Sequence, residues 1–154
     1  MTNLSISPAG LELIKKFELF MDHAYKDAVG VWTIGYGSTM FKNGSKPVEG
    51  QTITEAAATA LLSWGVDIRA RAIQHEILNP LNQNQQDAIL SLTYNIGVGG
   101  FVKSTVLRLI NRDQNDPMIR AAFNMWVKGT INGQKVPLPG LVYRRNKEAD
   151  LYFT

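Results

Sequence analysis

The chain contains no cysteine among its 154 residues. This absence excludes disulfide frameworks, thiolate zinc sites, iron–sulfur clusters and cysteine nucleophiles together. Long apolar runs are also missing near the N-terminus, because Glu12, Lys15, Lys16 and Glu18 interrupt the first helical segment. No stretch there has the length of a signal peptide or a membrane span. We therefore expect synthesis as a soluble cytoplasmic protein, with no stable membrane insertion.

The chain has little excess charge of one sign. It carries 16 Lys and Arg against 13 Asp and Glu, which gives a net charge of +3. Residues 78–154 carry 9 basic and 5 acidic side chains, whereas residues 1–77 carry 7 and 8. A mildly basic C-terminal half favours an anionic partner such as a wall polymer, a nucleic acid or a membrane surface. A nucleic-acid binder usually has a denser basic face, so a total of 19% charged residues gives that alternative weak support.

Internal repeats and low-complexity segments are absent as well. Apolar residues make up 45% of the chain, so general disorder is excluded and a buried core can form. A length of 154 residues is typical of one domain, which we expect to cover residues 1–154.

The first third of the chain predicts a helix followed by a hairpin. Ser7 followed by Pro8 is a typical helix start, with serine as the N-cap and proline in the first turn. Residues 31–36 then alternate with a period of two, and Gly30 is available for a turn. Residues 24 to about 50 are therefore predicted to form a small antiparallel sheet.

Helix signals dominate the remainder. Thr52 or Thr54 can cap a long helix that Pro80 must end near Asn79. A capping box at Asn82 starts the next helix, which Gly97 stops. Further helices are predicted from Ser104, from Asp116-Pro117 and from about Leu141 to Phe153, with a tight loop at Asn132-Gly133, Pro137 and Pro139. The predicted fold class is α+β: an N-terminal helix and β lobe at about 8–52, a helical lobe at about 53–154, and a cleft between them.

Three side chains between the first helix and the hairpin could carry chemistry. Glu18 lies in the last helical turn, partly on the apolar stripe, where desolvation would raise the pKa of a carboxyl group and keep it protonated. If the hairpin folds about Gly30, Asp27 and Thr33 face each other and could share a water molecule. One protonated carboxyl and one carboxylate holding water are the parts required to hydrolyse a glycosidic bond.

Each residue taken alone has a more ordinary structural role. A glutamate near a helix end is usually solvated or ion-paired, an aspartate before a turn is common, and threonine suits a strand. The spacing favours a catalytic role over these structural ones, because Asp27 follows Glu18 by nine residues and Thr33 follows Asp27 by six.

This pattern, within Ala24-Tyr25-Lys26-Asp27 and Thr33-Ile34-Gly35-Tyr36-Gly37, closely resembles the phage-type lysozymes of glycoside hydrolase family 24. Later segments resemble the family too, over about residue 6 to the end of the chain. They are Tyr94-Asn95-Ile96-Gly97 with Phe101 and Ser104-Thr105, and Trp126 with Pro139-Gly140-Leu141 and Arg144-Arg145 through Glu148.

The resemblance implies an endolysin, a muramidase that hydrolyses the β-1,4 bond between N-acetylmuramic acid and N-acetylglucosamine in peptidoglycan. Glu18 would act as the acid, and Asp27 with Thr33 would handle the water, with inversion. By matching position, Thr39, Tyr94, Ser104 and Arg120 would line the cleft and contact substrate. The resemblance implies no metal or organic cofactor. Because no signal segment is recognised, we expect a monomer that needs a membrane lesion, such as a holin makes, before it reaches the wall.

Two residues depart from the family pattern. Leu19 stands where many members have glycine after the acid, and Ser38 stands where many have histidine after the Gly-x-Gly of the hairpin. We expect these changes to affect rate and pH optimum rather than the reaction class. Two alternatives keep the fold: a non-catalytic peptidoglycan-binding or scaffold protein, and a lytic transglycosylase that forms anhydro ends without water.

Other polar signals have simpler explanations. His23 and His75 lie far apart in the sequence and form no His-x-x-x-His pair, so no metal site is predicted. The glycines at 97, 99 and 100 lack the following lysine of a phosphate loop and are interpreted as turn residues. Arg144 or Arg145 could face the cleft and pair with Glu18, or both could be solvated.

Overall fold

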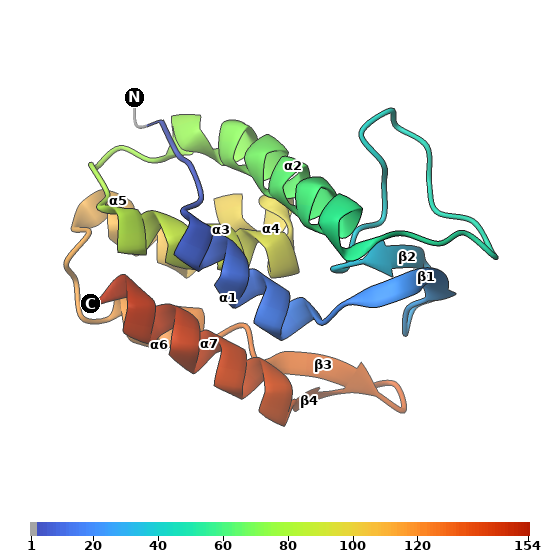
Figure 1. The fold of residues 1–154 in the computed structure, drawn as a ribbon. Helices are drawn as coiled ribbons and strands as arrows, with labels where there is room; N and C mark the ends of the chain where they lie inside the picture. The colour runs from blue at the N-terminus through green and yellow to red at the C-terminus, as the bar shows by residue number, and fades with distance from the viewer. Residues whose placement is uncertain (1–2) are drawn as a thin grey trace.

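The structure, a computed structural model, describes residues 3–154 as an assembly of helices with two small hairpins (Figure 1). One hairpin follows the first helix and the other precedes the last helix. The elements are α1 (Pro8–Glu18), β1 (Met21–Lys26), β2 (Trp32–Gly35), α2 (Glu55–Ile73), η1 (Gln74–Glu76), α3 (Gln83–Ile96), α4 (Val98–Val102), α5 (Thr105–Arg112), α6 (Ile119–Phe123), β3 (Lys128–Ile131), β4 (Gln134–Pro137) and α7 (Pro139–Tyr152). The predicted α+β class is confirmed.

Most predicted helix starts are confirmed by their caps. The Ser7 hydroxyl accepts from the backbone N–H of Gly10, and Thr54 caps α2 in the same way. At α3 the Asn82 side chain and the Gln85 side chain form the expected reciprocal capping box. Each cap satisfies a backbone N–H that the first helical turn leaves without a partner.

Several predicted boundaries were wrong. The α2 helix ends at Ile73, ahead of the expected limit near Asn79, because a short 3₁₀ turn over Gln74–Glu76 follows it. Gly99 and Gly100 lie within the short helix α4, although we interpreted them as turn glycines. Asp116 accepts from the N–H of Met118 at 2.8 Å, but regular helix begins only at Ile119.

The N-terminal sheet is smaller than predicted. Only β1 and β2 pair as strands, and residues 36–54 form a long loop with isolated bridges at Ile34 to Ser38 and at His23 to Thr52. A regular strand is interrupted in this loop because its glycines at 37, 44 and 50 have positive φ angles.

A second hairpin, β3 and β4, occupies the segment that we predicted to be a tight loop. Its two-residue turn is Asn132-Gly133, with φ angles of 51° and 78°. Two consecutive positive φ angles are typical of the type I′ turn that matches strand twist, and Asn-Gly is the sequence that favours it. The signal for a hairpin was therefore present in the sequence.

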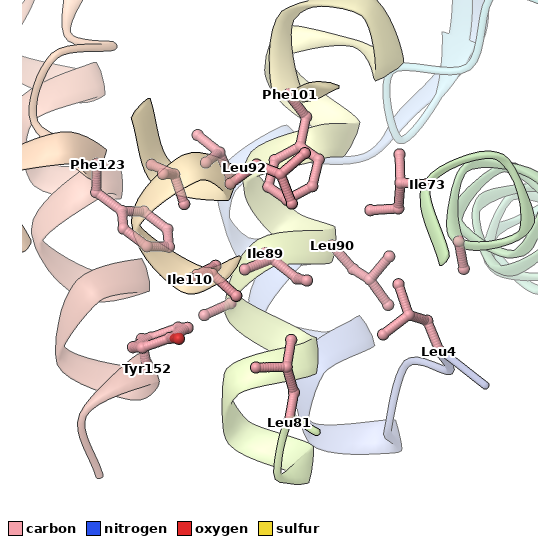
Figure 2. Close-up of a cluster of buried hydrophobic side chains, with 14 of the residues drawn as sticks. Leu4, Ile73, Leu81, Ile89, Leu90, Leu92, Phe101, Ile110, Phe123 and Tyr152 are labelled. Atoms are coloured by element: carbon pink, nitrogen blue, oxygen red, sulfur yellow. The ribbon is translucent and has the colours of Figure 1, made fainter. Parts of the chain in front are cut away.

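The main core lies between the helices. Figure 2 shows part of it, with side chains from the N-terminal segment, α2, α3 and the C-terminal helices in contact. The labelled residues are Leu4, Ile73, Leu81, Ile89, Leu90, Leu92, Phe101, Ile110, Phe123 and Tyr152. A smaller cluster of Ala24, Ile34 and Leu61 joins the hairpin to α2. The predicted division into lobes at about residue 52 falls just before α2, and the extent of the domain stays a prediction.

Candidate functional site

Glu18 is the last residue of helix α1. The N-terminal end of this helix is fixed to α3 by hydrogen bonds. The backbone N–H of Ser7 donates to Asp87 Oδ1 at 2.9 Å, and its hydroxyl donates to the other oxygen of this buried carboxylate. Gly10 faces the same carboxylate, and a Cβ there would lie 2.5 Å from Asp87 Cγ. Glycine therefore lets α1 approach α3 closely, and Glu18 lies at the C-terminal end of the helix so placed.

The residue after Glu18 has an unusual backbone conformation. Leu19 has φ 57° and ψ 149°, a region that is populated almost only by glycine. Its N–H still donates to Lys15 O at 3.0 Å, so it terminates α1 while the chain turns sharply into β1. The leucine side chain is 67% exposed. The departure from the family pattern at this position thus places a leucine where the backbone demands a glycine conformation.

The Glu18 carboxylate is ion-paired with the last helix. Arg144 donates from Nη1 to Glu18 Oε1 at 2.7 Å, and the Glu18 side chain is 19% exposed. The surroundings are therefore less apolar than the sequence analysis expected. Glu18 and Arg144 both line a hollow of about 420 Å³. The other residues of its wall are Phe17, Asn95, Leu138, Gly140 and Leu141.

The second oxygen of Glu18 lies against the hairpin loop. A Cβ at Gly37 would be 2.7 Å from Glu18 Oε2 and 3.8 Å from Cε1 of Tyr94. Gly37 also has a φ of +78°, so both space and backbone conformation require glycine there. Glu18, Gly37 and Tyr94 therefore meet at one point, although they come from three different segments.

A buried network holds Arg144 in place. Its Nε donates to Glu148 Oε2 at 3.2 Å and its Nη2 donates to the carbonyl oxygen of Ser91 at 3.0 Å. Its guanidinium carbon lies 4.8 Å from the centre of the Phe17 ring, within cation–π range. Glu148 is fully buried and also accepts from Arg145 Nη1 at 2.6 Å. One carboxylate thus partly balances two buried guanidinium groups.

Arg145 faces away from Glu18 and ties α7 to its neighbours. Its Nε donates to Trp126 O at 2.9 Å, and its Nη2 donates to Asn95 Oδ1. Burial lowers the pKa of Arg145, and the negative charge of Glu148 opposes that effect. The expectation that either arginine could pair with Glu18 is met by Arg144, and neither side chain is solvated.

The hairpin register differs from the predicted one. Tyr25 pairs with Thr33 and Lys26 pairs with Trp32, so Asp27 does not lie directly opposite Thr33. The N–H of Asp27 instead donates to Val31 O at 2.9 Å. Asp27 therefore extends the strand pairing by one position, and it is a diagonal neighbour of Thr33. The prediction placed the turn one residue too far along the chain.

Asp27 and Thr33 both make local hydrogen bonds. Asp27 Oδ1 accepts from the N–H groups of Val29 at 3.0 Å and Val31 at 2.9 Å, which closes the turn. The Thr33 hydroxyl donates to Val31 O at 3.0 Å, and Thr33 is buried. The second oxygen of Asp27 has no hydrogen-bond partner within residues 3–154.

Tyr25 lies within the electrostatic reach of both candidate carboxylates. Burial raises the pKa of Tyr25, and the negative charges of Glu18 and Asp27 raise it further. A phenol whose ionisation both carboxylates oppose must be near each of them, since interactions between charges weaken with distance. Tyr25 and Asp27 are two residues apart along the paired strand, so their side chains lie on the same face of the hairpin.

Two of the four predicted substrate contacts line one hollow, and one of them, Tyr94, also lies close to Gly37, which faces Glu18. Thr39 and Tyr94 line a small hollow of about 70 Å³ next to Ser38 and Gly65. The Tyr94 hydroxyl donates to the carbonyl oxygen of Tyr36 at 2.8 Å. Burial raises the pKa of Tyr94 to about 12, so the phenol stays a donor near neutral pH.

The other two predicted contacts lie elsewhere. Ser104 is buried as the N-cap of α5, where it accepts from Leu107 N and donates to Phe101 O at 2.6 Å. Arg120 forms an ion pair with Asp150 at 2.9 Å between α6 and α7. Because the serine is committed to a cap and the arginine to an ion pair, the structure does not bring either to Glu18.

Sequence reasoning missed Glu148, Ser91 and Gly37 as parts of the site. The signal for Glu148 was its spacing of four and three residues from the two arginines, which places all three on one helical face. The Gly-x-Gly pattern was a signal for Gly37, but the pattern did not reveal that Gly37 lies against Glu18. Ser91 gave no signal beyond its place in an apolar helix.

The described residues show neither a metal-binding cluster nor a helix suited to span a membrane. Residues 3–154 contain no group of three His, Cys, Asp or Glu side chains arranged to hold a metal ion. Over the same residues, no helix combines the length and the apolar character that crossing a bilayer requires.

Comparison with known proteins identifies the family. The model of the family described as phage lysozyme matches residues 15–148. The chain belongs to the phage lysozyme family. This confirms the resemblance found in the sequence motifs.

Relatives of this phage lysozyme match it over nearly its whole length. The endolysin of Acyrthosiphon pisum secondary endosymbiont phage 1 is 39% identical over 149 residues, which is 97% of this chain and 98% of that protein. Among solved structures, the endolysin from Escherichia coli O157:H7 phage FAHEc1 is 36% identical, with a TM-score of 0.90, covering 98% of this chain and 94% of that one. The muramidase domain of SpmX from Asticaccaulis excentricus is 36% identical, with a TM-score of 0.86, covering 98% and 99%. The family and these endolysins support a lysozyme-type peptidoglycan hydrolase with a role in phage-mediated lysis.

Proposed function

We propose that this phage lysozyme is a muramidase of glycoside hydrolase family 24, cleaving the β-1,4 bond between N-acetylmuramic acid and N-acetylglucosamine. The observation that carries the proposal is the placement of Glu18 in the wall of a 420 Å³ hollow, with Arg144 2.7 Å from one oxygen. A carboxyl group held at a hollow of this kind can reach a bound glycosidic oxygen. The SpmX domain named a muramidase shares this fold at 36% identity.

The two oxygens of Glu18 have different tasks in this mechanism. Oε1 accepts from Arg144, whereas Oε2 faces Gly37 and has no hydrogen-bond donor within residues 3–154. When Glu18 acts as the acid, Oε2 is the oxygen that is free to carry the proton. In the reaction this proton passes to the glycosidic oxygen as its bond to the anomeric carbon breaks.

Asp27 completes the hydrolysis. Water attacks the anomeric carbon from the face opposite the leaving sugar, and its proton passes to the free oxygen of Asp27, which gives inversion. The Thr33 hydroxyl donates to Val31 O, so it orients the water as an acceptor. Thr39 and Tyr94 contact the sugar chain from the neighbouring hollow.

A lytic transglycosylase is the second candidate, and the hairpin supplies an observation in its favour. Asp27 Oδ1 already accepts two turn N–H groups, and the Thr33 proton is already donated. Only one carboxylate oxygen is left to hold water. If water is held too weakly, the sugar's own hydroxyl attacks and anhydro ends form.

The cellular setting follows from the same proposal. The protein acts as a monomer on peptidoglycan, accumulates in the host cytoplasm, and depends on a holin to reach the periplasm and wall. The basic C-terminal half favours binding to the anionic polymer.

The decisive experiment is mass spectrometry of the fragments that the wild type and Glu18→Gln release from purified peptidoglycan. We expect reducing muramic acid ends from the wild type and almost none from the variant, because an amide cannot donate the required proton. Glu12→Gln is the matched control, since Glu12 is an exposed residue on the same helix. Anhydro ends would establish the transglycosylase. Absence of fragments from wild type and variant alike would leave a binding or scaffold protein.

A further inference from the structure

Arg69 on α2 is held by a carbonyl oxygen and an aromatic ring, and within residues 3–154 it has no acidic partner. Its Nη1 donates to Gly65 O at 2.8 Å, and its guanidinium carbon lies 4.7 Å from the centre of the Tyr94 ring. Gly65 lies against both groups, because a Cβ there would be in ordinary van der Waals contact with Arg69 Nη1 at 3.4 Å and with Tyr94 Cε2 at 3.6 Å. Within residues 3–154 no carboxylate oxygen lies within 4 Å of this guanidinium.

Arg69 is connected to the surroundings of the candidate acid through the ring of Tyr94. It lines the 70 Å³ hollow with Thr39 and Tyr94, and it lines a second hollow of about 320 Å³ with Gly97 and Val98. The Tyr94 ring that it packs on also touches Gly37, whose α-carbon faces Glu18 Oε2. The hollow that Arg69 and Tyr94 line is therefore linked to Glu18 by way of Gly37.

The other arginines near the site already have carboxylate partners. Arg144 and Arg145 share Glu148, and Arg144 also pairs with Glu18. A guanidinium that stacking and a carbonyl hold in place presents its remaining N–H groups in a planar fork. This fork matches a carboxylate, and little side-chain entropy is lost when the two bind.

We propose that Arg69 binds a carboxylate of the peptidoglycan strand while the strand lies across Glu18. The proposal rests on the proposed function and names the chemistry that the site recognises next to the cleaved bond. Peptidoglycan offers carboxylates from two sources, the stem peptide and the lactyl group of a muramic acid whose peptide has been removed. Arg69 thereby distinguishes wall glycan from an uncharged chain of N-acetylglucosamine.

The first test measures binding in the Glu18→Gln background, so that the ligand is not consumed. Calorimetry compares this protein with the double variant that adds Arg69→Gln. The probes are a disaccharide tetrapeptide, amidase-treated glycan strands with free lactyl carboxylates, and an N-acetylglucosamine hexamer. We expect about tenfold weaker binding of at least one carboxylate-bearing probe, as the loss of charge-assisted hydrogen bonds implies. Hexamer binding should stay unchanged.

The pattern across probes identifies the source of the carboxylate. A loss for the disaccharide tetrapeptide alone assigns the stem peptide, and a loss for the stripped glycan alone assigns the lactyl group. Equal binding of every probe by the two proteins would overturn the proposal. An equal loss for the hexamer would overturn it as well, because the guanidinium would then be recognising sugar or merely supporting Tyr94.

Kinetics provides the second readout. Arg69→Gln should raise KM for peptidoglycan about tenfold and leave kcat within twofold. Arg71→Ala is the matched control. Arg71 is exposed on the same helix, and its substitution removes the same positive charge. Arg69→Lys should recover part of the affinity, because it restores the charge without the fork. A fall in kcat with KM unchanged would contradict a substrate-binding role.

The binding test remains informative if the proposed reaction is wrong. A wild type that releases no fragments refutes the muramidase, but calorimetry still reports whether Arg69 selects carboxylate-bearing glycan. Conversely, an active muramidase whose Arg69→Gln variant binds all three probes normally refutes only the carboxylate site.

Discussion

The acid Glu18 and the hairpin residues Asp27 and Thr33 are positioned by different kinds of contact. Glu18 is held by Arg144, 126 residues later in the sequence, and through it by the buried Glu148. Asp27 and Thr33 are held by backbone groups no more than four residues away. The acid is therefore positioned by tertiary structure, whereas the hairpin pair is positioned by its own turn.

The two kinds of support fail in different ways. A buried ion-pair network cannot lose one member without leaving uncompensated charge in the interior. A turn at the surface can lose a side-chain hydrogen bond and be solvated by water instead. Changes near α7 should therefore affect stability and activity together, and changes in the hairpin should affect activity with little effect on stability.

The largest effect is expected for Glu148→Gln. Removing this charge leaves Arg145 without its acidic partner and Arg144 with only Glu18, so we expect a loss of about 3–5 kcal/mol in unfolding free energy. Activity should fall as well, because Arg144 is no longer fixed beside Glu18. Urea denaturation and an activity assay on the same sample measure both. Glu49→Gln, at an exposed residue, should stay within about 0.5 kcal/mol of the wild type. A loss below 1 kcal/mol would show that the network is not essential for stability.

A gain of stability is expected for Leu19→Gly. Glycine adopts φ 57° and ψ 149° without strain, so the substitution should raise the unfolding free energy by about 1–2 kcal/mol. Leu19→Ala is the control, because alanine loses the exposed side chain but keeps the strain. Thermal unfolding of the three proteins gives the answer. If the glycine variant were the less stable, contacts of the leucine side chain would have to outweigh the backbone strain.

The smallest effect on stability is expected in the hairpin. Asp27→Asn keeps an oxygen that can accept from Val29 and Val31, so stability should stay within about 0.5 kcal/mol of the wild type. Asp27→Ala removes that acceptor and should cost about 1 kcal/mol. Both variants should lose most lytic activity, since neither can take a proton from water. An active asparagine variant would remove Asp27 from the proposed mechanism.

Local signals account for the parts of the fold that were predicted correctly. Ser7, Thr54 and Asn82 each begin a helix because a side-chain oxygen satisfies a nearby N–H, an interaction that spans only three residues. Glu18 was singled out by its spacing within the motif, and its role as the acid stays a prediction. Such interactions can be recognised from a short window of sequence.

The features that the sequence left open or did not reveal depend on distant or finely balanced contacts. The pairing of Arg144 with Glu18 is decided by how α1 and α7 both pack on α3, which no local pattern specifies. The hairpin register depends on the position of the turn. The predicted centre of the turn was wrong by one residue, which is enough to change every cross-strand pair. Ser104 and Arg120 were assigned by matching position, and each is occupied by a contact that the motif does not reveal.

Gly37 shows that a residue without a side chain can limit which substitutions the site of this protein tolerates. Any other amino acid at this position would bring its Cβ within 2.7 Å of Glu18 Oε2, the oxygen proposed to carry the proton. In a library of single substitutions, position 37 should therefore behave like a catalytic position, with every replacement selected against. A search for active sites that considers only reactive side chains would pass over it.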